Sequence, residues 1–297
     1  MSSFDDLLNN FPADTPEQQG GQLSKEEYAE KKRAEREEVF ALSDNTALEV
    51  AGDGGKFRQY LDVQGRFDRY SAVNTLLILA QKPEATRIGD FDYWKSMGGF
   101  VRPRQSAISI LEPHEYTKED SSPGVGYNIK KVFDISQVDT RKVRINPPPN
   151  FTDRQLLSAL ISKAPVKIVG VDELPGNLGA VTDPETGGIF VRRGMEFSDT
   201  FRSVAQELCY ADLTTGPDFQ AEPHFSAYCA AYLLCKKYGV DAQDFDFSDA
   251  PSILGSMDAP EVKGELAKIR DVAGDVSGRM ARQLDAASKT ARNQEAR

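Results

Sequence analysis

The clearest chemical pattern in the sequence lies in the stretch Asp199–Leu213, DTFRSVAQELCYADL, with Gln206-Glu207-Leu208-Cys209-Tyr210 at its centre. Histidines at positions 206 and 210 would complete His-Glu-x-x-His, which places two zinc ligands one helical turn apart and a glutamate between them to activate water. Only the glutamate is present. A neutral amide is a poor zinc ligand, and a tyrosine phenol, with an ordinary pKa of about 10, is rarely an anion at neutral pH.

A second pattern lies between Lys56 and Gln105, where nine basic residues outnumber five acidic ones and aromatic residues are interleaved. Rings that stack on bases, beside cations that meet the backbone, suit single-stranded nucleic acid. The candidates for phosphate contacts are Lys56, Arg58, Arg66, Arg69, Lys95, Arg102 and Arg104, and those for base stacking are Tyr93 and Trp94. A plain core role fits these aromatics equally well, and it is slightly favoured for Trp94.

Hydrophobic periodicity and turn residues predict the elements that position these groups. A charged helix begins at a capping box, Ser24 to Glu27, and runs to about residue 43. A weak link is expected at 45–55 and a polar loop at 114–124. Further helices are predicted at 70–81, within 86–99, and at 152–164, 199–213, 225–238 and 261–287; strands are predicted at 107–111, 127–133 and 166–171, and a hairpin at 180–191.

Composition describes an acidic, water-soluble chain of 297 residues with a net charge of −10. Residues 1–55 hold thirteen acidic and five basic residues, so the charge is concentrated in this lead and the remainder is nearly neutral. No apolar run approaches the ~18 residues of a membrane span. Three cysteines in apolar contexts, Cys209, Cys229 and Cys235, argue against a disulfide framework. A reducing cytoplasm is the expected location, with no membrane partner.

Two segments carry a resemblance to a known family: RYSAVNTLLILAQKPEATRIGDFDYWKSMGGFVRPRQSAISILEP at 69–113 and VFDISQVD at 132–139. Their order of Tyr-Ser-x-x-Asn, Pro-x-Ala-Thr, Trp-x-x-x-Gly, a basic turn, Ile-x-Ile-x-x-Pro and Phe-Asp-Ile-Ser-Gln resembles the N-terminal domain of the ArdC-type antirestriction proteins of plasmids and conjugative elements. The resemblance covers about half of the folded chain. It implies an α+β fold, with a small single-stranded-DNA-binding domain followed by a zincin-like metallopeptidase domain.

The chain departs from that family at the metal site. The resemblance places the two histidine ligands at Gln206 and Tyr210 and the third, acidic ligand at or near Tyr228, so only the general base, Glu207, is kept. It therefore implies a pseudo-metallopeptidase with no metal, no cofactor and no catalytic residue beyond the remnant Glu207. A replacement site of His224, Cys209 and Cys229 is chemically conceivable. However, a shift of one residue turns a side chain about 100° around its helix, and buried cysteines usually only pack.

The expected organisation has four parts: a disordered acidic N-terminus at 1–23, an ArdC-like domain with a charged leading helix at 24–145, a degenerate zincin-like domain at 146–288, and a frayed basic tail at 289–297. The predicted function is sequence-nonspecific binding of single-stranded DNA by an antirestriction protein of a mobile genetic element. Two alternatives stay open. One is a zinc metallopeptidase with non-standard ligands, and the other is a non-enzymatic interaction module that recruits a protein partner through the amphipathic helix 261–287.

Overall fold

The computed structural model describes residues 24–118, 120–145, 149–215 and 223–295, with side chains up to residue 286. The predicted disordered N-terminus therefore lies outside the described residues, as do 146–148 of the predicted linker. Helices and small sheets alternate along the chain, and the α+β class predicted from the sequence is confirmed.

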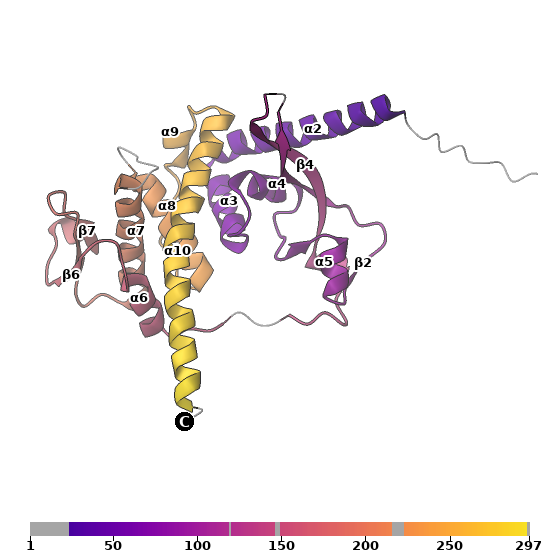
Figure 1. Cartoon of the computed structure of the whole chain (residues 1–297). Helices are drawn as coiled ribbons and strands as arrows, with labels where there is room; N and C mark the ends of the chain where they lie inside the picture. The colour runs from indigo at the N-terminus through magenta and orange to yellow at the C-terminus, as the bar shows by residue number, and fades with distance from the viewer. Residues whose placement is uncertain (1–23, 119, 146–148, 216–222, 296–297) are drawn as a thin grey trace, which may run out of the picture.

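A long C-terminal helix, α10 (Ala259–Glu295), runs through the molecule between two groups of elements (Figure 1). On one side are α2 (Lys25–Ala51), α3 (Gly54–Arg66) and α4 (Ala72–Gln81). On the other are α6 (Asp153–Ile161), α7 (Phe197–Thr215) and α8 (His224–Tyr238). Helix α10 contacts members of both groups, and α3 also packs directly on α8. The helix continues through most of the tail expected to fray.

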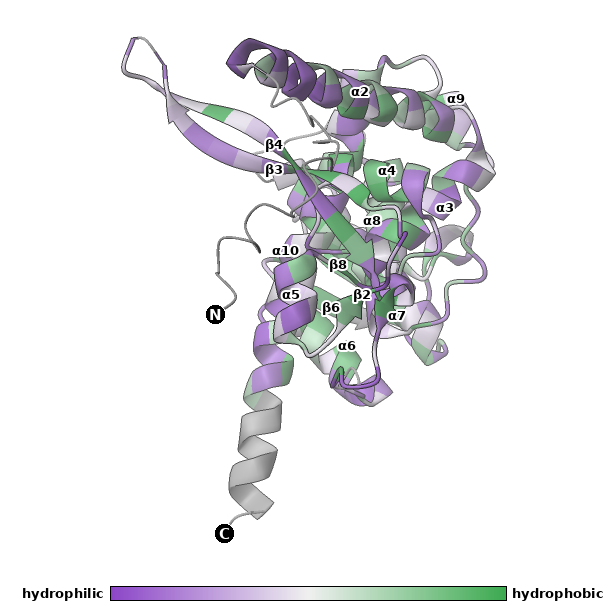
Figure 2. Cartoon of the chain, turned by 90° about the vertical axis from the view of Figure 1, so that its right-hand side faces the viewer, coloured by the Kyte–Doolittle hydropathy of each residue, from purple (hydrophilic) through white to green (hydrophobic). Residues whose placement is uncertain are grey.

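The N-terminal sheet is built around an antiparallel pair, β3 (Ile108–Thr117) and β4 (Pro123–Asp134), with the short β1 (Ile88–Gly89) beside β4. The far end of the β3–β4 pair projects from the body as a two-stranded arm (Figure 2). A second small ladder pairs β2 (Phe100–Val101) with β5 (Val138–Asp139), which follows the 3-10 turn η1 (Ile135–Gln137). Helix α5 (Phe91–Ser96) lies between β1 and β2 and contacts both.

The C-terminal sheet has the order β6-β8-β7, with β6 (Ile168–Val171) parallel to β8 (Ile189–Arg192) and β7 (Ala180–Thr182) antiparallel to it. The hairpin expected at 180–191 is the β7–β8 pair, and α7 packs on both of its strands. Short elements complete the chain: the turn η2 (Pro175–Asn177) before β7 and the helix α9 (Ala250–Leu254) before α10.

One continuous hydrophobic core joins the two groups of helices. It includes Phe57 and Leu61 of α3, Leu208 of α7, Leu234 of α8 and Ile269 of α10, all fully buried. A separate small core under α5 holds Trp94, Phe133 and Val138. The domain boundary at residue 146 stays a prediction, and the helices on its two sides share the main core.

Two local expectations were wrong, and tertiary contacts explain both. The weak link expected from residue 45 is the last part of α2, because Ala47 and Val50 are buried in the main core. The polar loop expected at 114–124 is mostly strand, because β3 and β4 pair residue by residue as far as Thr117 and Pro123. None of the described helices combines the length and apolar character needed to cross a lipid bilayer.

Candidate functional site

Helix α7 places the residues of the Gln-Glu-Leu-Cys-Tyr stretch on two faces. Leu208 and Cys209 point into the core and are fully buried. Gln206, Glu207 and Tyr210 are partly exposed on the opposite side. The stretch therefore forms the amphipathic helix predicted from its spacing, and the three positions that the family pattern reserves for catalysis share the accessible face.

Glu207 is engaged by the neighbouring strand. Its carboxylate Oε2 accepts hydrogen bonds from the backbone N–H of Thr182, at 2.8 Å, and from the Thr182 hydroxyl, at 2.7 Å. Thr182 is the last residue of β7, so the carboxylate fixes the edge of the sheet to α7. The one retained catalytic position of the family pattern thus works here as a contact between sheet and helix.

The two tyrosines at ligand positions are also engaged within the protein. The ring of Tyr210 stacks on His224, the first residue of α8, with centroids 4.6 Å apart. The hydroxyl of Tyr228 accepts a hydrogen bond from the backbone N–H of Asp246, at 2.8 Å, and its ring packs on Phe245. Burial raises the pKa of Tyr228 above its ordinary value, so the phenol stays protonated at neutral pH.

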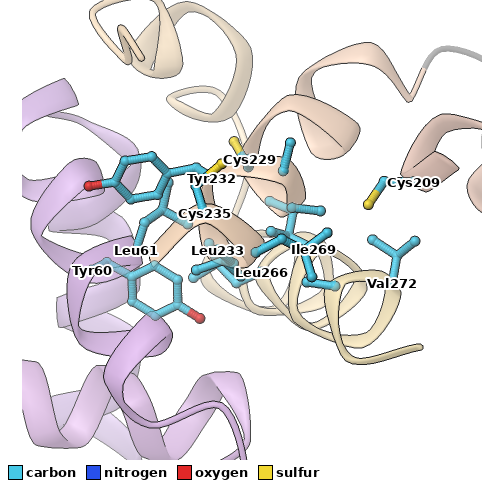
Figure 3. Close-up of a cluster of buried hydrophobic side chains, with 14 of the residues drawn as sticks. Tyr60, Leu61, Cys209, Cys229, Tyr232, Leu233, Cys235, Leu266, Ile269 and Val272 are labelled. Carbon is cyan, nitrogen blue, oxygen red and sulfur yellow. The ribbon is translucent and has the colours of Figure 1, made fainter. Parts of the chain in front are cut away.

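The cysteines do not supply a replacement site. Figure 3 shows Cys209 directed toward Val272 of α10, among the buried side chains of the core. Burial raises the pKa of all three thiols, that of Cys235 to about 12, as expected for cysteines that pack in a core. Among the described residues no three His, Cys, Asp or Glu side chains come together as a metal site. The donor set of α7 and α8 does not fit a catalytic metal.

The structure divides the aromatic residues of the basic stretch between Lys56 and Gln105 into buried and exposed ones. Trp94 is fully buried beneath α5, and its indole N–H donates to the carbonyl of Phe133 at 2.9 Å. Its position favours the core role weighed above, because no ring face is open to a base. Phe57 and Tyr60 are likewise fully buried. Tyr93, by contrast, is 38% exposed and its ring covers Gly89.

The cations predicted to contact phosphate fall into two sets. Lys56 pairs with Glu49 at 2.8 Å, Arg58 donates to the carbonyl of Phe245 at 3.0 Å, and Arg66 donates to the carbonyl of Pro83. These three bind the protein itself, and Arg69, which is exposed, follows the end of α3. Helix α3, which carries the first set of cations, lies apart from α5 in Figures 1 and 2, so the two sets are separated in space.

Lys95 lies on α5, whereas Arg102 and Arg104 lie in the turn directly after β2, a strand that contacts α5; all three are exposed. Of these, only Arg102 has a hydrogen bond to a described residue, the carbonyl of Ser136, and that bond leaves the rest of its guanidinium to solvent.

Four further exposed residues, which were not among the DNA-contact candidates predicted from the sequence, extend this group. Phe91 and Phe100 are 61% and 62% exposed, although large aromatics are usually buried. Lys142 and Arg144 are exposed on the segment after β5, whose backbone passes beside Gly98 and Gly99. We call the group Phe91, Tyr93, Lys95, Phe100, Arg102, Arg104, Lys142 and Arg144 the basic–aromatic corner.

The corner is held by a buried carboxylate. Asp134 accepts hydrogen bonds from the backbone N–H groups of Thr86, Arg87 and Ser136, at 2.8, 3.0 and 2.8 Å. Burial alone would raise the pKa of Asp134, but these bonds and one from the Ser136 side chain lower it below the ordinary value. Two carboxylates also lie on this surface: Asp92, exposed on α5, and Asp139, which is opposite Phe100 in the β2–β5 pair and pairs with Arg141.

Comparison with solved structures identifies the architecture. The metal-free crystal structure of the antirestriction ArdC protein from the R388 plasmid superposes with a TM-score of 0.52, covering 72% of this chain and 86% of that protein at 16% sequence identity. Its Mn(II)-bound structure gives a TM-score of 0.50 at the same identity, covering 72% and 85%. This chain has the ArdC fold. No model of a protein family matches the sequence, and no curated protein matches it either.

The ArdC likeness confirms the architecture expected from the resemblance of residues 69–113. One form of the R388 ArdC protein holds Mn(II). In the present ArdC-like chain, Tyr210 and Tyr228 at the expected ligand positions are used in a ring stack and a backbone hydrogen bond.

Proposed function

We propose that this chain binds single-stranded DNA without sequence preference through the basic–aromatic corner, and that its peptidase-like half is a non-catalytic scaffold. Protection of incoming DNA from restriction is the corresponding role, because the R388 protein of the same fold is an antirestriction protein. No peptidase or metal chemistry is assigned to α7 and α8.

The observation that carries the proposal is the exposure of three aromatic rings among five cations. Phe91, Tyr93 and Phe100 offer ring faces to solvent beside α5 and β2. Each base stacked on such a ring contributes roughly 1–3 kcal/mol, largely independent of sequence, while Lys and Arg side chains meet the phosphates. The same number of exposed rings without nearby cations would suit a protein partner instead.

The backbone at Arg104 adds support. Arg104 has φ of 61°, in the left-handed region that glycine adopts far more readily than arginine. Such a conformation costs on the order of 1 kcal/mol, and an arginine retained at this cost is typical of a position selected for its side chain. The turn projects the guanidinium into solvent next to Arg102.

The test is a fluorescence-anisotropy titration of labelled single-stranded and duplex DNA across a salt series, with metal content measured on the same sample. The proposal predicts salt-dependent binding that favours the single strand, with sub-stoichiometric zinc and manganese. Phe100→Ala weakens binding roughly fivefold or more. Tyr28→Ala, a matched control at a 56% exposed ring on α2, leaves it unchanged. Absence of single-strand binding by the wild type, or equal effects of the two variants, overturns the proposal.

A further inference from the structure

A cavity of about 270 Å³ lies where the end of α3 meets α8 and α10, away from both regions described above. Its wall combines Gly65 of α3, Leu233 and Leu234 of α8, and Ala273 and Gly274 of α10 with charged residues from the same elements. Because three separate helices build the cavity, it depends on the shared core and not on a single loop.

The charged residues of the wall are predominantly cationic. Arg69, Lys237 and Arg270 contribute positive charge, and Asp68 is the carboxylate among the lining residues that the structure describes. Lys237 Nζ lies 2.6 Å from Asp68 Oδ2 and 3.0 Å from the Ser277 hydroxyl. Arg270 pairs with Asp271 on its own helix, while Arg69 has no hydrogen bond or ion pair with any described residue.

The floor of the cavity is apolar and its α10 side is open. A Cβ atom added at Gly274 would meet no atom within 4 Å. Gly264 and Gly274 are both exposed on α10, and of the two only Gly274 lines the cavity. A larger side chain at 274 would narrow the opening of the cavity. The glycine therefore leaves room beside Leu233 and Ala273 for a flat apolar group, with cations at the rim.

We propose that this cavity binds the phosphate monoester of a nucleotide, with the base or sugar on the apolar floor and the phosphate at Arg69, Arg270 and Lys237. Guanidinium groups bind phosphate with paired donors, and lysine adds a point charge. A concave site with an apolar lining and a few converging charged groups is the usual form of a small-molecule site. The proposal does not depend on DNA binding by the basic–aromatic corner.

A free nucleotide and the phosphorylated end of a DNA strand carry the same chemistry, and both are included in the test. Isothermal titration of the full chain compares dTMP, thymidine, and a ten-residue oligo(dT) with a 5′-phosphate or a 5′-hydroxyl. The proposal predicts dTMP binding at least tenfold tighter than that of thymidine. A 5′-phosphate that tightens oligonucleotide binding tenfold identifies the strand end as the source, and tight dTMP binding without that effect identifies the free nucleotide.

Two substitutions on α10 provide a matched pair. Gly274→Leu narrows the opening of the cavity and weakens dTMP binding at least tenfold, while Gly264→Leu, where an added Cβ also meets no atom within 4 Å, leaves it unchanged. Both changes raise helix propensity, so both variants are expected to fold, and circular dichroism checks this. Arg270→Gln weakens dTMP about tenfold and leaves thymidine binding unchanged. Equal binding of dTMP and thymidine, no dTMP binding, or unaltered binding by Gly274→Leu would overturn the proposal.

Discussion

The peptidase-like site and the basic–aromatic corner differ in what their polar and aromatic groups contact. At the former, Glu207 holds Thr182, Tyr210 stacks on His224 and Tyr228 accepts from the Asp246 N–H. At the corner, rings such as Phe91 and Phe100 remain exposed. The polar and aromatic groups of the first region contact one another or nearby backbone, whereas the corner keeps large ring areas and cations exposed to solvent.

The segment after α8 connects the C-terminal helices to the N-terminal ones. Phe245 packs on Tyr228 and Tyr232 of α8, and the carbonyl of Phe245 accepts from Arg58 of α3. Tyr228 is thus connected, through one segment, to the N-terminal helices. Losing the C-terminal helices would expose the shared core of α3, α8 and α10. The shared core therefore gives these helices a packing role in the fold.

The largest expected effect, on the free energy of unfolding, distinguishes buried Trp94, which supports the basic–aromatic corner, from exposed Tyr93 on its surface. Trp94→Ala removes a fully buried ring and the indole hydrogen bond to Phe133, and should lower the free energy of unfolding by about 3–5 kcal/mol. Tyr93→Ala on the same helix should lower it by less than about 1 kcal/mol and weaken DNA binding. Urea unfolding measures both. A stable Trp94→Ala variant with lost DNA binding would show that Trp94 belongs to the binding surface.

The next effect concerns the role of Glu207. Glu207→Ala leaves two donors of Thr182 without their acceptor and should lower the free energy of unfolding by about 2 kcal/mol, with single-strand affinity unchanged. Thr182→Val removes one of the two bonds and should cost less. Chemical unfolding and anisotropy titration check the two halves of this expectation. A stabilised Glu207→Ala protein would mean that the carboxylate is kept for a reason other than this contact.

Local sequence signals predicted the parts of the fold that depend on short-range chemistry. The capping box from Ser24 to Glu27 and the hairpin at 180–191 both follow from neighbouring residues, and the structure has each of them. The strand pairing at 114–117 and the last turns of α2 depend on distant partners, and there the sequence predicted loop.

The candidate sites were predictable to a different extent. Residue types alone predict that Gln206 and Tyr210 do not bind zinc, because side-chain chemistry decides metal binding, and this stays a prediction. Composition could not separate buried aromatics such as Phe57 from exposed ones such as Phe91, because burial depends on which helices meet. Lys142, distant in sequence from α5, joined the corner only through the β2–β5 pairing.

A smaller effect is the pH dependence of stability that the buried carboxylate of Asp134 gives to the basic–aromatic corner. Hydrogen bonds lower the pKa of Asp134 in the folded protein, so its carboxylate stabilises the fold above the unfolded pKa of about 4 and loses this contribution as pH falls through the folded value. Asp134→Asn should therefore cost about 1–2 kcal/mol at pH 7, with the difference from wild type shrinking below pH 4. Urea titrations at pH 7, 5 and 3 measure it, and a constant difference would contradict the assignment.

The smallest expected effect concerns Arg104. Arg104→Gly relieves the left-handed backbone and should leave stability unchanged or raise it by up to about 1 kcal/mol. Loss of one phosphate contact should reduce the slope of log affinity against log salt by about 0.7 for a single strand. Anisotropy across a salt series gives the slope. An unchanged slope would place the phosphate contacts elsewhere on the corner.

The most direct test of the central comparison is hydrogen–deuterium exchange of the full chain with and without a saturating oligo(dT). The account predicts slower exchange in residues 91–105 and 138–145, with α7 and α8 unchanged. Slower exchange confined to residues 197–238 would contradict it, because the ligand would then occupy the peptidase-like helices and the corner would be only surface.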